Sequence, residues 1–432
     1  MNYSETIDYL FSSLPAFHQQ GATAYKPGLE RIGEFCRRLG NPQRNYFIIH
    51  VAGTNGKGSV SNMIAAILQQ AGYQTGLFTS PHLTDFRERI KVNGEMISKQ
   101  KVVNFVDKHR RDMEECELSF FEMTTALAFD YFAQSEVEVA VIETGLGGRL
   151  DATNIVIPIL SIITNVGLEH TALLGDSLPK IAREKAGIIK KSIPVIVGEC
   201  NPNYNLVIEE TAHDMHSNLI YAENAFACHG QSVANDKQVF DMVRLRDGQE
   251  YRLQLGLLGE YQRQNIITAC AVADYLHENT PLSISRRALV DGLRDVADIT
   301  GFRGRWQVIA TSPLTVCDTG HNPHGIALVG EQLRHRTATR LCCVMGFCVD
   351  KNIEEMLRLM PSDAHYIFTR ADVARAAAPE HIAETAHSLG LECETAATVG
   401  EALSRARGML SAEDMLFVGG STFVVAEAIS GA

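Results

Sequence analysis

Short apolar, β-branched runs alternate with helical patterns along most of the chain. In the first half, strand-like runs occur at 47–51, 77–79, 139–143, 159–164 and 195–197. Helical patterns lie between them, and the one at 59–70 is closed by Gly72. Because strands that alternate with helices usually form a mainly parallel sheet covered on both faces, the pattern predicts an α/β fold. In such folds, ligands bind at the carboxyl ends of the strands.

The pattern changes at 225–258, where polar, turn-rich segments around 239–245 and 251–257 predict a small antiparallel sheet. After a break at 300–304 the alternation resumes, with strands at 314–317, 341–345, 366–368 and 415–418 and helices at 353–360, 379–389 and 400–408. A chain of 432 residues exceeds one comfortable core. We therefore predict two domains, 1–297 and 298–432, with the boundary near 297–305 and a smaller, Rossmann-like α/β second domain.

Composition narrows the class of protein. The net charge of −12 disfavours non-specific binding to nucleic acid or anionic membranes, since both need a basic face. The ten cysteines form no CxxC pair, which favours a reducing cytoplasm without zinc or structural disulfides. Residues 1–14 have no basic segment followed by a long apolar core, so they predict an amphipathic helix rather than a signal peptide. The longest apolar stretch, 155–163, is too short to span a bilayer.

The segment Val51-Ala-Gly-Thr-Asn-Gly-Lys-Gly-Ser59 has the form of a phosphate-binding turn between a strand and a helix. Glycines allow successive N–H groups to converge on a phosphate, and the helix that follows adds its positive N-terminus. Lys57 supplies a charge for the outer phosphates, and Ser59 can reach them or a metal. Two residues rather than four separate Gly53 from Gly56, so an ordinary tight turn is the alternative.

Three polar residues follow predicted strands and should meet near this turn. They are Ser80, Glu143 and His170. A hydroxyl, a carboxylate and an imidazole can share a Mg²⁺ that bridges nucleotide phosphates, although histidine is an unusual Mg²⁺ ligand. The alternatives are a capping or ion-paired role for Glu143 and a hydrogen-bonded, half-buried histidine at 170.

Two further segments carry candidate residues. Lys185 lies within Arg183-Glu-Lys-Ala-Gly187, a helical pattern for which a solvated charged face is the simplest interpretation. Asp318 and His321 lie in Asp318-Thr-Gly-His-Asn-Pro323, which follows a strand and precedes a helix. We place them in a site-forming loop, while His-Asn-Pro is also a good turn sequence.

Taken together, the segments resemble the folylpolyglutamate synthase/dihydrofolate synthase family of the Mur ligase superfamily. The matching pieces occur in family order over roughly 25–325: the phosphate-loop segment, Thr79-Ser-Pro-His-Leu83, Phe120-Phe-Glu122, Glu143-Thr-Gly-Leu-Gly-Gly-Arg-Leu-Asp-Ala-Thr-Asn154, Arg183-Glu-Lys-Ala-Gly-Ile188, Gly304-Arg305 and Asp318-Thr-Gly-His-Asn-Pro323. Gly320 replaces the alanine common in the family, and 121–124 differ from known bifunctional versions, which leaves the acceptor less determined than the ligase chemistry.

The resemblance implies roles for individual residues. A phosphate-loop ATPase-type first domain would bind ATP through Asn55, Gly56, Lys57, Gly58, Ser59, Asn265, Arg305, Asp318 and His321. Metal ligands would be Ser80, Glu143, His170 and Lys185, the last as a carbamate, and Lys57, Lys185 and His170 would be the catalytic set. Phe121, Glu122, Leu150, Asp151 and Ala152 would line the pterin pocket.

The implied reaction is ATP- and Mg²⁺-dependent amide-bond formation between L-glutamate and a pterin or folate carboxylate, carried out by a cytoplasmic monomer. A bifunctional enzyme acting on dihydropteroate and reduced folates is the favoured reading. Its alternatives are a monofunctional folylpolyglutamate synthase or another Mur-type ligase, and a nucleotide-dependent switch without ligase activity. The ordered set Glu143, His170, Lys185, Arg305 and Asp318 disfavours the switch, which needs no acyl-phosphate site.

Overall fold

A computed structural model describes residues 1–14 and 26–431 of the chain. The described chain divides into two compact units. The first comprises 1–256 and 262–302, and the second comprises 257–261 and 303–432. Relative to the boundary expected at 297/298, residues 298–302 lie in the first unit, because the short helix α12 (Val296–Thr300) packs on the helix of the phosphate loop. The segment 257–261 was expected in the first domain and lies in the second unit.

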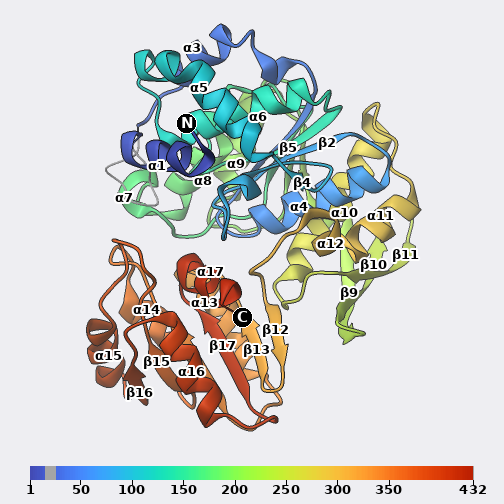
Figure 1. The fold of residues 1–432 in the computed structure, drawn as a ribbon. Helices are drawn as coiled ribbons and strands as arrows, with labels where there is room; N and C mark the ends of the chain where they lie inside the picture. The colour runs from blue at the N-terminus through green and yellow to red at the C-terminus, as the bar shows by residue number, and fades with distance from the viewer. Residues whose placement is uncertain (15–25, 432) are drawn as a thin grey trace. The chain divides into compact units, whose positions relative to one another are not determined.

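The first unit is built on an eight-stranded sheet (Figure 1). In pairing order its strands are β4 (Glu95–Met96), β3 (Ile90–Val92), β2 (Thr75–Phe78), β5 (Val139–Glu143), β1 (Phe47–Ala52), β6 (Leu160–Ile163), β7 (Val195–Val197) and β8 (Leu219–Tyr221). Strands β2 and β5 to β8 run parallel to β1, and only β3 and β4 are antiparallel to their neighbours. The expected mainly parallel sheet is confirmed.

Helices cover both faces of this sheet, as the nearly continuous apolar runs of its central strands require. On one face, the core joins the strands to α1 (Tyr3–Ser13), α3 (Glu30–Arg38), α5 (Lys99–Glu115) and α6 (Phe120–Gln134). Over β6 and β7, the core is formed with α7 (Thr171–Leu174), α8 (Leu178–Ala186) and α9 (Asn205–Asp214). Against β1, β2 and β5 lies α4 (Lys57–Gln70), itself packed against α10 (Gln262–Asn279), α11 (Arg286–Arg294) and α12.

Helix α4 starts two residues earlier than the predicted start at Ser59. Gly56 adopts a left-handed conformation with φ 82° and is the N-cap, so Lys57 and Gly58 already belong to the first helical turn. The ring of Phe302 lies directly against Gly58, where a side chain would crowd it. The glycine is therefore explained by close packing and not by a loop conformation, which is why the sequence pattern placed the helix start too late.

The second unit is a smaller α/β domain around a six-stranded sheet (Figure 1). Its strands pair in the order β12 (Gln307–Thr311), β13 (Leu314–Cys317), β17 (Met415–Gly419), β14 (Leu341–Met345), β15 (His365–Phe368) and β16 (Cys393–Thr395), with only β12 antiparallel. Its helices are α13 (Pro323–Arg334), α14 (Ile353–Arg358), α15 (Pro379–Ser388), α16 (Val399–Met409) and α17 (Thr422–Ser430). The first three contribute to one core, while α16 and α17 pack against each other.

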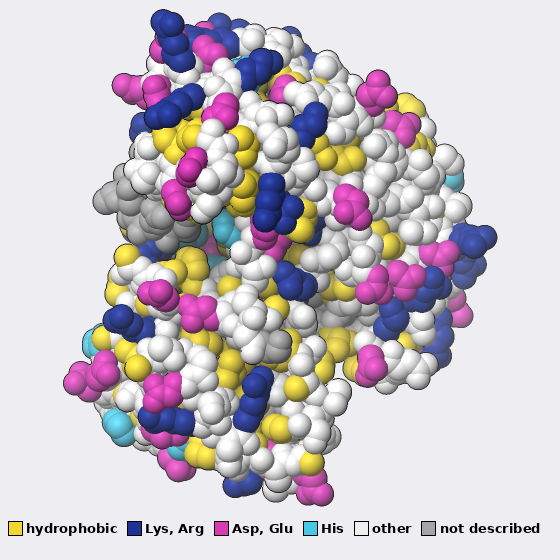
Figure 2. All heavy atoms as spheres, viewed as in Figure 1, with side chains coloured by type: hydrophobic (Ala, Val, Ile, Leu, Met, Phe, Trp, Pro, Cys, Tyr) yellow, Lys and Arg dark blue, Asp and Glu magenta, His cyan; other side chains and the backbone are white. Residues whose placement is uncertain are grey.

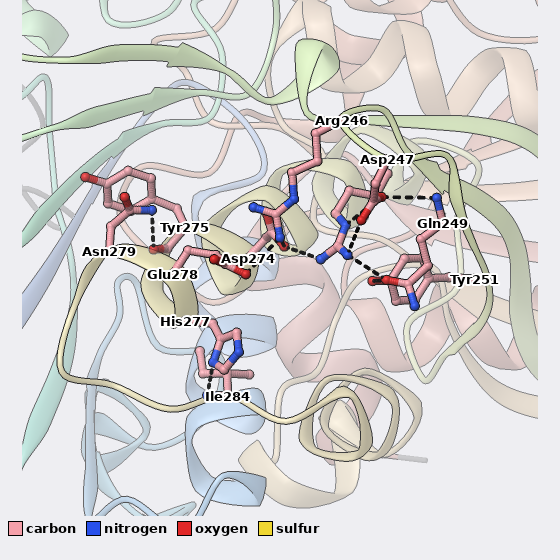
Figure 3. Close-up of polar contacts among 11 residues, drawn as sticks. Arg246, Asp247, Gln249, Tyr251, Asp274, Tyr275, His277, Glu278, Asn279 and Ile284 are labelled. Carbon is pink, nitrogen blue, oxygen red and sulfur yellow. Dashed lines mark hydrogen bonds and ion pairs between the residues drawn. The ribbon is translucent and has the colours of Figure 1, made fainter.

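The expected antiparallel excursion is a three-stranded sheet formed by β9 (Phe226–Ala234), β10 (Lys237–Arg244) and β11 (Gln249–Leu255). Two arginines at the β10–β11 turn attach it to α10 (Figure 3). Arg244 lies 2.8 Å and Arg246 3.2 Å from the same Asp274 carboxylate oxygen, and Arg246 also pairs with Glu278 at 2.8 Å. Because α10 begins at the residues nearest the phosphate loop, this network fixes the far end of a helix that reaches the candidate site.

We expect Asp274→Asn to destabilise the first unit by about 1–3 kcal/mol, because two arginines lose a shared, mostly buried anionic partner. Urea unfolding gives the free energy, and amide hydrogen exchange in β9–β11 should rise. Glu278→Gln is the matched control, since Glu278 is exposed and its pair with Arg246 should contribute little. Equal stability of Asp274→Asn and the wild-type protein would contradict the assignment.

On the face of the protein seen in Figure 2, Lys and Arg side chains are mostly interspersed with Asp and Glu, and a group of them at the right edge also contains acidic side chains. Within residues 1–14 and 26–431, every helix is too short or too polar to cross a bilayer.

Candidate functional site

The conformation of the turn after β1 is fixed by hydrogen bonds to residues distant in sequence. Thr54 N–H donates to the carbonyl of Asn165 at 3.0 Å, and Asn55 N–H donates to the Asn165 side chain at 2.9 Å. Lys57 Nζ donates to the carbonyls of Gly53 and Thr54 at 3.0 and 3.1 Å. The lysine therefore curls over its own loop, in the position from which an ammonium group can meet a phosphate.

Helix α10 contributes side chains to the same turn. Gln262 Nε2 donates to Ser59 Oγ at 3.3 Å, and Asn265 Nδ2 donates to Gln262 Oε1 at 2.8 Å. A side chain at Gly56 would clash with Asn265, so glycine is required there both by conformation and by close approach. The structure thus brings Asn265 to Gly56–Ser59, as the resemblance implied for ATP binding.

Glu143 ends β5, beside β1 and β2, and is almost fully buried. Its Oε2 lies 3.4 Å from the backbone nitrogen of Ser80, so these two candidate metal ligands are adjacent. Nearby, Arg89 is buried and donates from Nε to His82 Nδ1 at 2.8 Å. Burial lowers the pKa of Arg89 to about 10, while the negative charge of Glu143 acts to raise it. The edge therefore combines a buried carboxylate with a compensating cation.

His170 and Lys185 lie on the part of the unit formed by α7 and α8. His170 is the N-cap of α7, and its Nε2 lies 3.6 Å from Glu169 Oε1. Lys185 lies in α8 with 1% of its surface exposed, which rules out the solvated-face interpretation. Burial, together with the positive charge of Lys57, lowers the pKa of Lys185 to about 7, and Glu169 and Asp151 oppose this shift. An amine in this setting is partly neutral, and therefore nucleophilic, near neutral pH.

The loop after β5 is organised by the Asp151 carboxylate. Asp151 Oδ1 accepts hydrogen bonds from Thr153 N at 3.1 Å and Thr153 Oγ1 at 2.6 Å, and Oδ2 accepts from Leu146 N at 2.7 Å. Burial raises the pKa of Asp151, and these hydrogen bonds counter the rise. Asp151 also caps the short helix η4 (Ala152–Ile155). Of its neighbours, Leu150 is half-buried and Ala152 is buried.

Phe121 and Glu122 begin α6. The Phe121 ring packs against Gly145, where a side chain would clash, and its centroid lies 5.9 Å from that of Phe78. Glu122 accepts from Ser119 N at 2.8 Å in a capping box and forms an ion pair with Arg31 at 3.2 Å. Phe121 and Asp151 therefore flank one glycine-rich loop, whereas Glu122 already serves the helix N-terminus and Arg31.

In the second unit, Asp318 follows β13 and is buried. Its carboxylate accepts hydrogen bonds from Tyr261 Oη at 2.5 Å, Trp306 N at 2.9 Å and Gly320 N at 2.7 Å. Arg305 donates to Thr319 Oγ1, and His321 Nδ1 lies 3.0 Å from the Thr319 carbonyl. The structure therefore gathers Arg305, Asp318 and His321 around one loop.

Several residues of these clusters were not predicted as site residues, among them Asn165, Glu169 and Tyr261. Asn165 and Glu169 lie in the segment 164–170 that ends at His170, and their position after a strand was an available signal. No sequence signal indicated Tyr261, because its partner Asp318 is 57 residues away and a single aromatic side chain before Gln262 is unremarkable.

The regions that match known proteins cover most of the chain. The Mur ligase middle domain matches residues 51–273, and the Mur ligase glutamate ligase domain matches residues 304–422. A dihydrofolate synthase/folylpolyglutamate synthase of Bacillus subtilis is 35% identical over 375 residues, 81% of this chain and 84% of the relative. A probable bifunctional folylpolyglutamate synthase/dihydropteroate synthase of Haloferax volcanii is 35% identical over 99% of this chain, which spans about half (50%) of that relative's length.

Solved structures agree with the sequence comparison. Escherichia coli FolC in complex with DHPP and ADP has a TM-score of 0.85 and 29% identity, covering 100% of this chain and 97% of its own. A bifunctional folylpolyglutamate synthase/dihydrofolate synthase with Mn, AMPPNP and L-glutamate bound has a TM-score of 0.83 and 27% identity, covering 100% and 98%. The chain therefore belongs to the Mur ligase family and, within it, to the folylpolyglutamate synthases/dihydrofolate synthases.

Proposed function

We propose that this protein is an ATP-dependent ligase that joins L-glutamate to dihydropteroate and then to reduced folates through an acyl phosphate. The observation that carries the proposal is the assembly, in one unit, of a phosphate loop, a strand-end carboxylate and a buried lysine of lowered pKa. Family membership and the ligands described for its relatives, which include ADP and L-glutamate, support the choice of reactants.

Residues Asn55 to Ser59 bind the triphosphate. The N–H groups at the start of α4 would donate to the phosphate, and Lys57 would exchange its loop carbonyls for the outer phosphate oxygens. Asn265 contacts the turn at Gly56 within the first unit. The family resemblance assigns Arg305, Asp318 and His321 of the second unit to nucleotide binding as well.

The residues present fit a magnesium ion that is shared with phosphates. Among the residues described by the structure, no three His, Cys, Asp or Glu side chains form a ready metal cage. Mg²⁺ usually takes one or two carboxylates together with waters and substrate phosphates, so a site with Glu143 as its main anionic ligand is consistent. Ser80 and His170 would complete the protein's ligands, and the ion would supply charge neutralisation for the phosphoryl group.

Lys185 carries a carbamate in the active enzyme. An ammonium group repels a metal ion, whereas a carbamate formed from the neutral amine and CO₂, with loss of a proton, offers carboxylate-like oxygens. Its burial and its lowered pKa favour the neutral amine, and the family resemblance supports the modification. The carbamate would serve as a ligand for a second Mg²⁺, as the family resemblance implies.

The chemistry requires positioning more than covalent catalysis. The acceptor carboxylate oxygen takes the γ-phosphoryl group, which converts a poor electrophile into an acyl phosphate. Lys57 and the loop N–H groups stabilise the charge on the transferring group. The glutamate amine then attacks the acyl carbon, and phosphate leaves from the tetrahedral intermediate. No protein nucleophile is needed.

The pterin pocket is lined by Phe121, Leu150, Asp151 and Ala152, and Glu122 holds the start of α6.

Tyr261 should act on nucleotide binding through Asp318. We expect Tyr261→Phe to raise the KM for ATP about threefold to tenfold, because Asp318 loses one of three hydrogen bonds that orient it. Steady-state kinetics at saturating acceptor and glutamate measures the change. Tyr221→Phe, which removes a hydroxyl bonded to the exposed Glu209, is the matched control and should leave the KM unchanged. An unchanged KM in Tyr261→Phe would refute this role.

Two other functions lead to different results in one assay. A monofunctional folylpolyglutamate synthase, or another Mur-type ligase, shares the nucleotide site but differs in its acceptor. A nucleotide switch would bind ATP without acceptor-dependent turnover.

We place the enzyme in the cytoplasm as a monomer that binds neither nucleic acid nor membranes.

The test is phosphate release from ATP with Mg²⁺ and L-glutamate, with dihydropteroate and tetrahydrofolate supplied separately. Release with both acceptors supports the bifunctional enzyme. Release with tetrahydrofolate alone assigns a monofunctional folylpolyglutamate synthase. No release with either acceptor, from protein that still binds ATP, contradicts the proposed function.

A further inference from the structure

A histidine stands in the centre of the first unit where an apolar residue would be expected. His50 lies in β1, paired with Ile142 of β5 on one side and Ser161 of β6 on the other, and is fully buried. Its neighbours on the same face of β1 are Ile48 and Ala52, both buried in apolar cores. Burying an imidazole costs free energy unless its nitrogens find partners, so its presence here requires an explanation.

One ring nitrogen of His50 has a partner and the other has none in the described structure. Nε2 lies 2.8 Å from Thr153 Oγ1, whereas Nδ1 is buried without a hydrogen-bond partner among the described residues. Leaving Nδ1 without a partner costs free energy, and an apolar side chain would avoid this cost. What the histidine adds over an apolar residue is therefore its hydrogen bond to Thr153.

The direction of this bond follows from the next one. Thr153 Oγ1 lies 2.6 Å from Asp151 Oδ1, and a threonine hydroxyl has one hydrogen to donate. A carboxylate accepts, so the hydroxyl hydrogen points to Asp151 and the hydroxyl oxygen accepts from His50 Nε2–H. The resulting chain is His50 to Thr153 to Asp151. Burial, with the positive charge of Lys190, lowers the pKa of His50 to about 3, so the ring stays neutral and the donor does not change near neutral pH.

We propose that His50 is a positioning residue for the pterin acceptor, holding the Asp151 carboxylate in place through the Thr153 hydroxyl. This inference rests on the proposed function, because it assigns a purpose to the Asp151 side of the acceptor pocket. The same carboxylate ties down Leu146 N–H, so the chain also fixes the loop that carries Gly145 under the Phe121 ring. His50 lies on the strand that leads into the phosphate loop, and it therefore sets the acceptor loop against the element that binds ATP.

The test separates acceptor binding from nucleotide binding. We expect His50→Leu to raise the KM for dihydropteroate and tetrahydrofolate about tenfold and to change the KM for ATP less than about twofold. Thr153→Val should reproduce this effect, since it removes the hydroxyl and keeps the side-chain volume. The double variant should be no worse than either single variant, because both break one chain. His50→Gln, which can place an amide N–H near the position of Nε2, should recover part of the lost affinity.

Thr75→Ala is the matched control. Thr75 is a fully buried threonine at the start of β2, and its hydroxyl donates to the Tyr73 carbonyl, away from Asp151. This variant should leave the acceptor KM unchanged even if it lowers stability. In the wild-type protein, ¹⁵N NMR of His50 should show the Nε2–H tautomer.

Three results would overturn the inference: unchanged acceptor KM in His50→Leu, additive effects in the double variant, or an equal rise in the KM values for acceptor and ATP. A wild-type protein that turns over neither pterin acceptor would instead defeat the proposed function, and the inference with it. The two failures are distinguishable because the first appears only in the variants and the second already in the wild-type protein.

Discussion

Replacing Lys57 by alanine should lower kcat/KM at least about 10³-fold, because the γ-phosphoryl group loses the cation that stabilises its charge during transfer. The side chain already reaches over the loop, where its Nζ donates to the Gly53 and Thr54 carbonyls. Gly53 and Thr54 are both buried, so their carbonyls lose a charged donor in the variant. Urea unfolding checks that the variant is folded, and phosphate-release kinetics then measures the loss of activity.

Lys57→Arg and Lys180→Ala serve as controls. Arginine keeps the charge but presents a planar fork in place of a compact ammonium group, so we expect only partial recovery. Lys180 is an exposed lysine paired with Asp176, and its loss should leave kcat/KM unchanged. If Lys57→Ala retained more than about a tenth of wild-type kcat/KM, the phosphate-loop assignment would be wrong.

Lys185→Met should lower activity by at least about 10²-fold, since methionine can neither form a carbamate nor bind a hard metal ion. Short carboxylic acids supplied at high concentration should restore part of the activity by occupying the space of the carbamate. Removing dissolved CO₂ should slow the wild-type enzyme and leave the variant unaffected.

The same variant should change how the stability of the metal-free protein depends on pH. The pKa of Lys185 falls from 10.5 to about 7 on folding, so folding favours the neutral amine. The stability that this preference contributes is complete above 10.5, declines as the pH falls, and is lost below about 7. Methionine does not titrate, so the variant should become more stable relative to the wild-type protein as the pH is lowered from 10 to 7. Below pH 7 the difference in unfolding free energy between the two proteins should stay constant. A pH-independent difference in unfolding free energy would contradict the burial argument.

Local patterns predicted the elements that carry the chemistry. The strand 139–143, which ends at Glu143, follows from a continuous apolar run, and the turn at 53–58 follows from glycines next to a lysine. Both signals are contained in a few neighbouring residues, and local sequence reports such features well. The helix start at Lys57 was missed because the reason for Gly58 is the Phe302 ring, which local pattern cannot show.

Long-range pairs could not be predicted from pattern. His50 and Thr153 are separated by 103 residues, and Tyr261 and Asp318 by 57. Similarly, Arg183-Glu-Lys-Ala-Gly187 has the composition of a solvated helix face, although its turn toward the core leaves Lys185 buried. Whether a charged helical residue faces solvent or the site depends on which side of the helix packs on the sheet, and here only the family resemblance indicated the site.

The central claim is that the acceptor carboxylate is phosphorylated before the amide bond forms. Its most direct test uses dihydropteroate or tetrahydrofolate with ¹⁸O in the reacting carboxylate, together with ATP, Mg²⁺ and L-glutamate, and mass spectrometry of the phosphate released. Transfer of one ¹⁸O atom to phosphate for each amide bond formed is the predicted result, because the bridging oxygen leaves with the phosphoryl group. Amide formation that releases phosphate without ¹⁸O would contradict the acyl-phosphate mechanism.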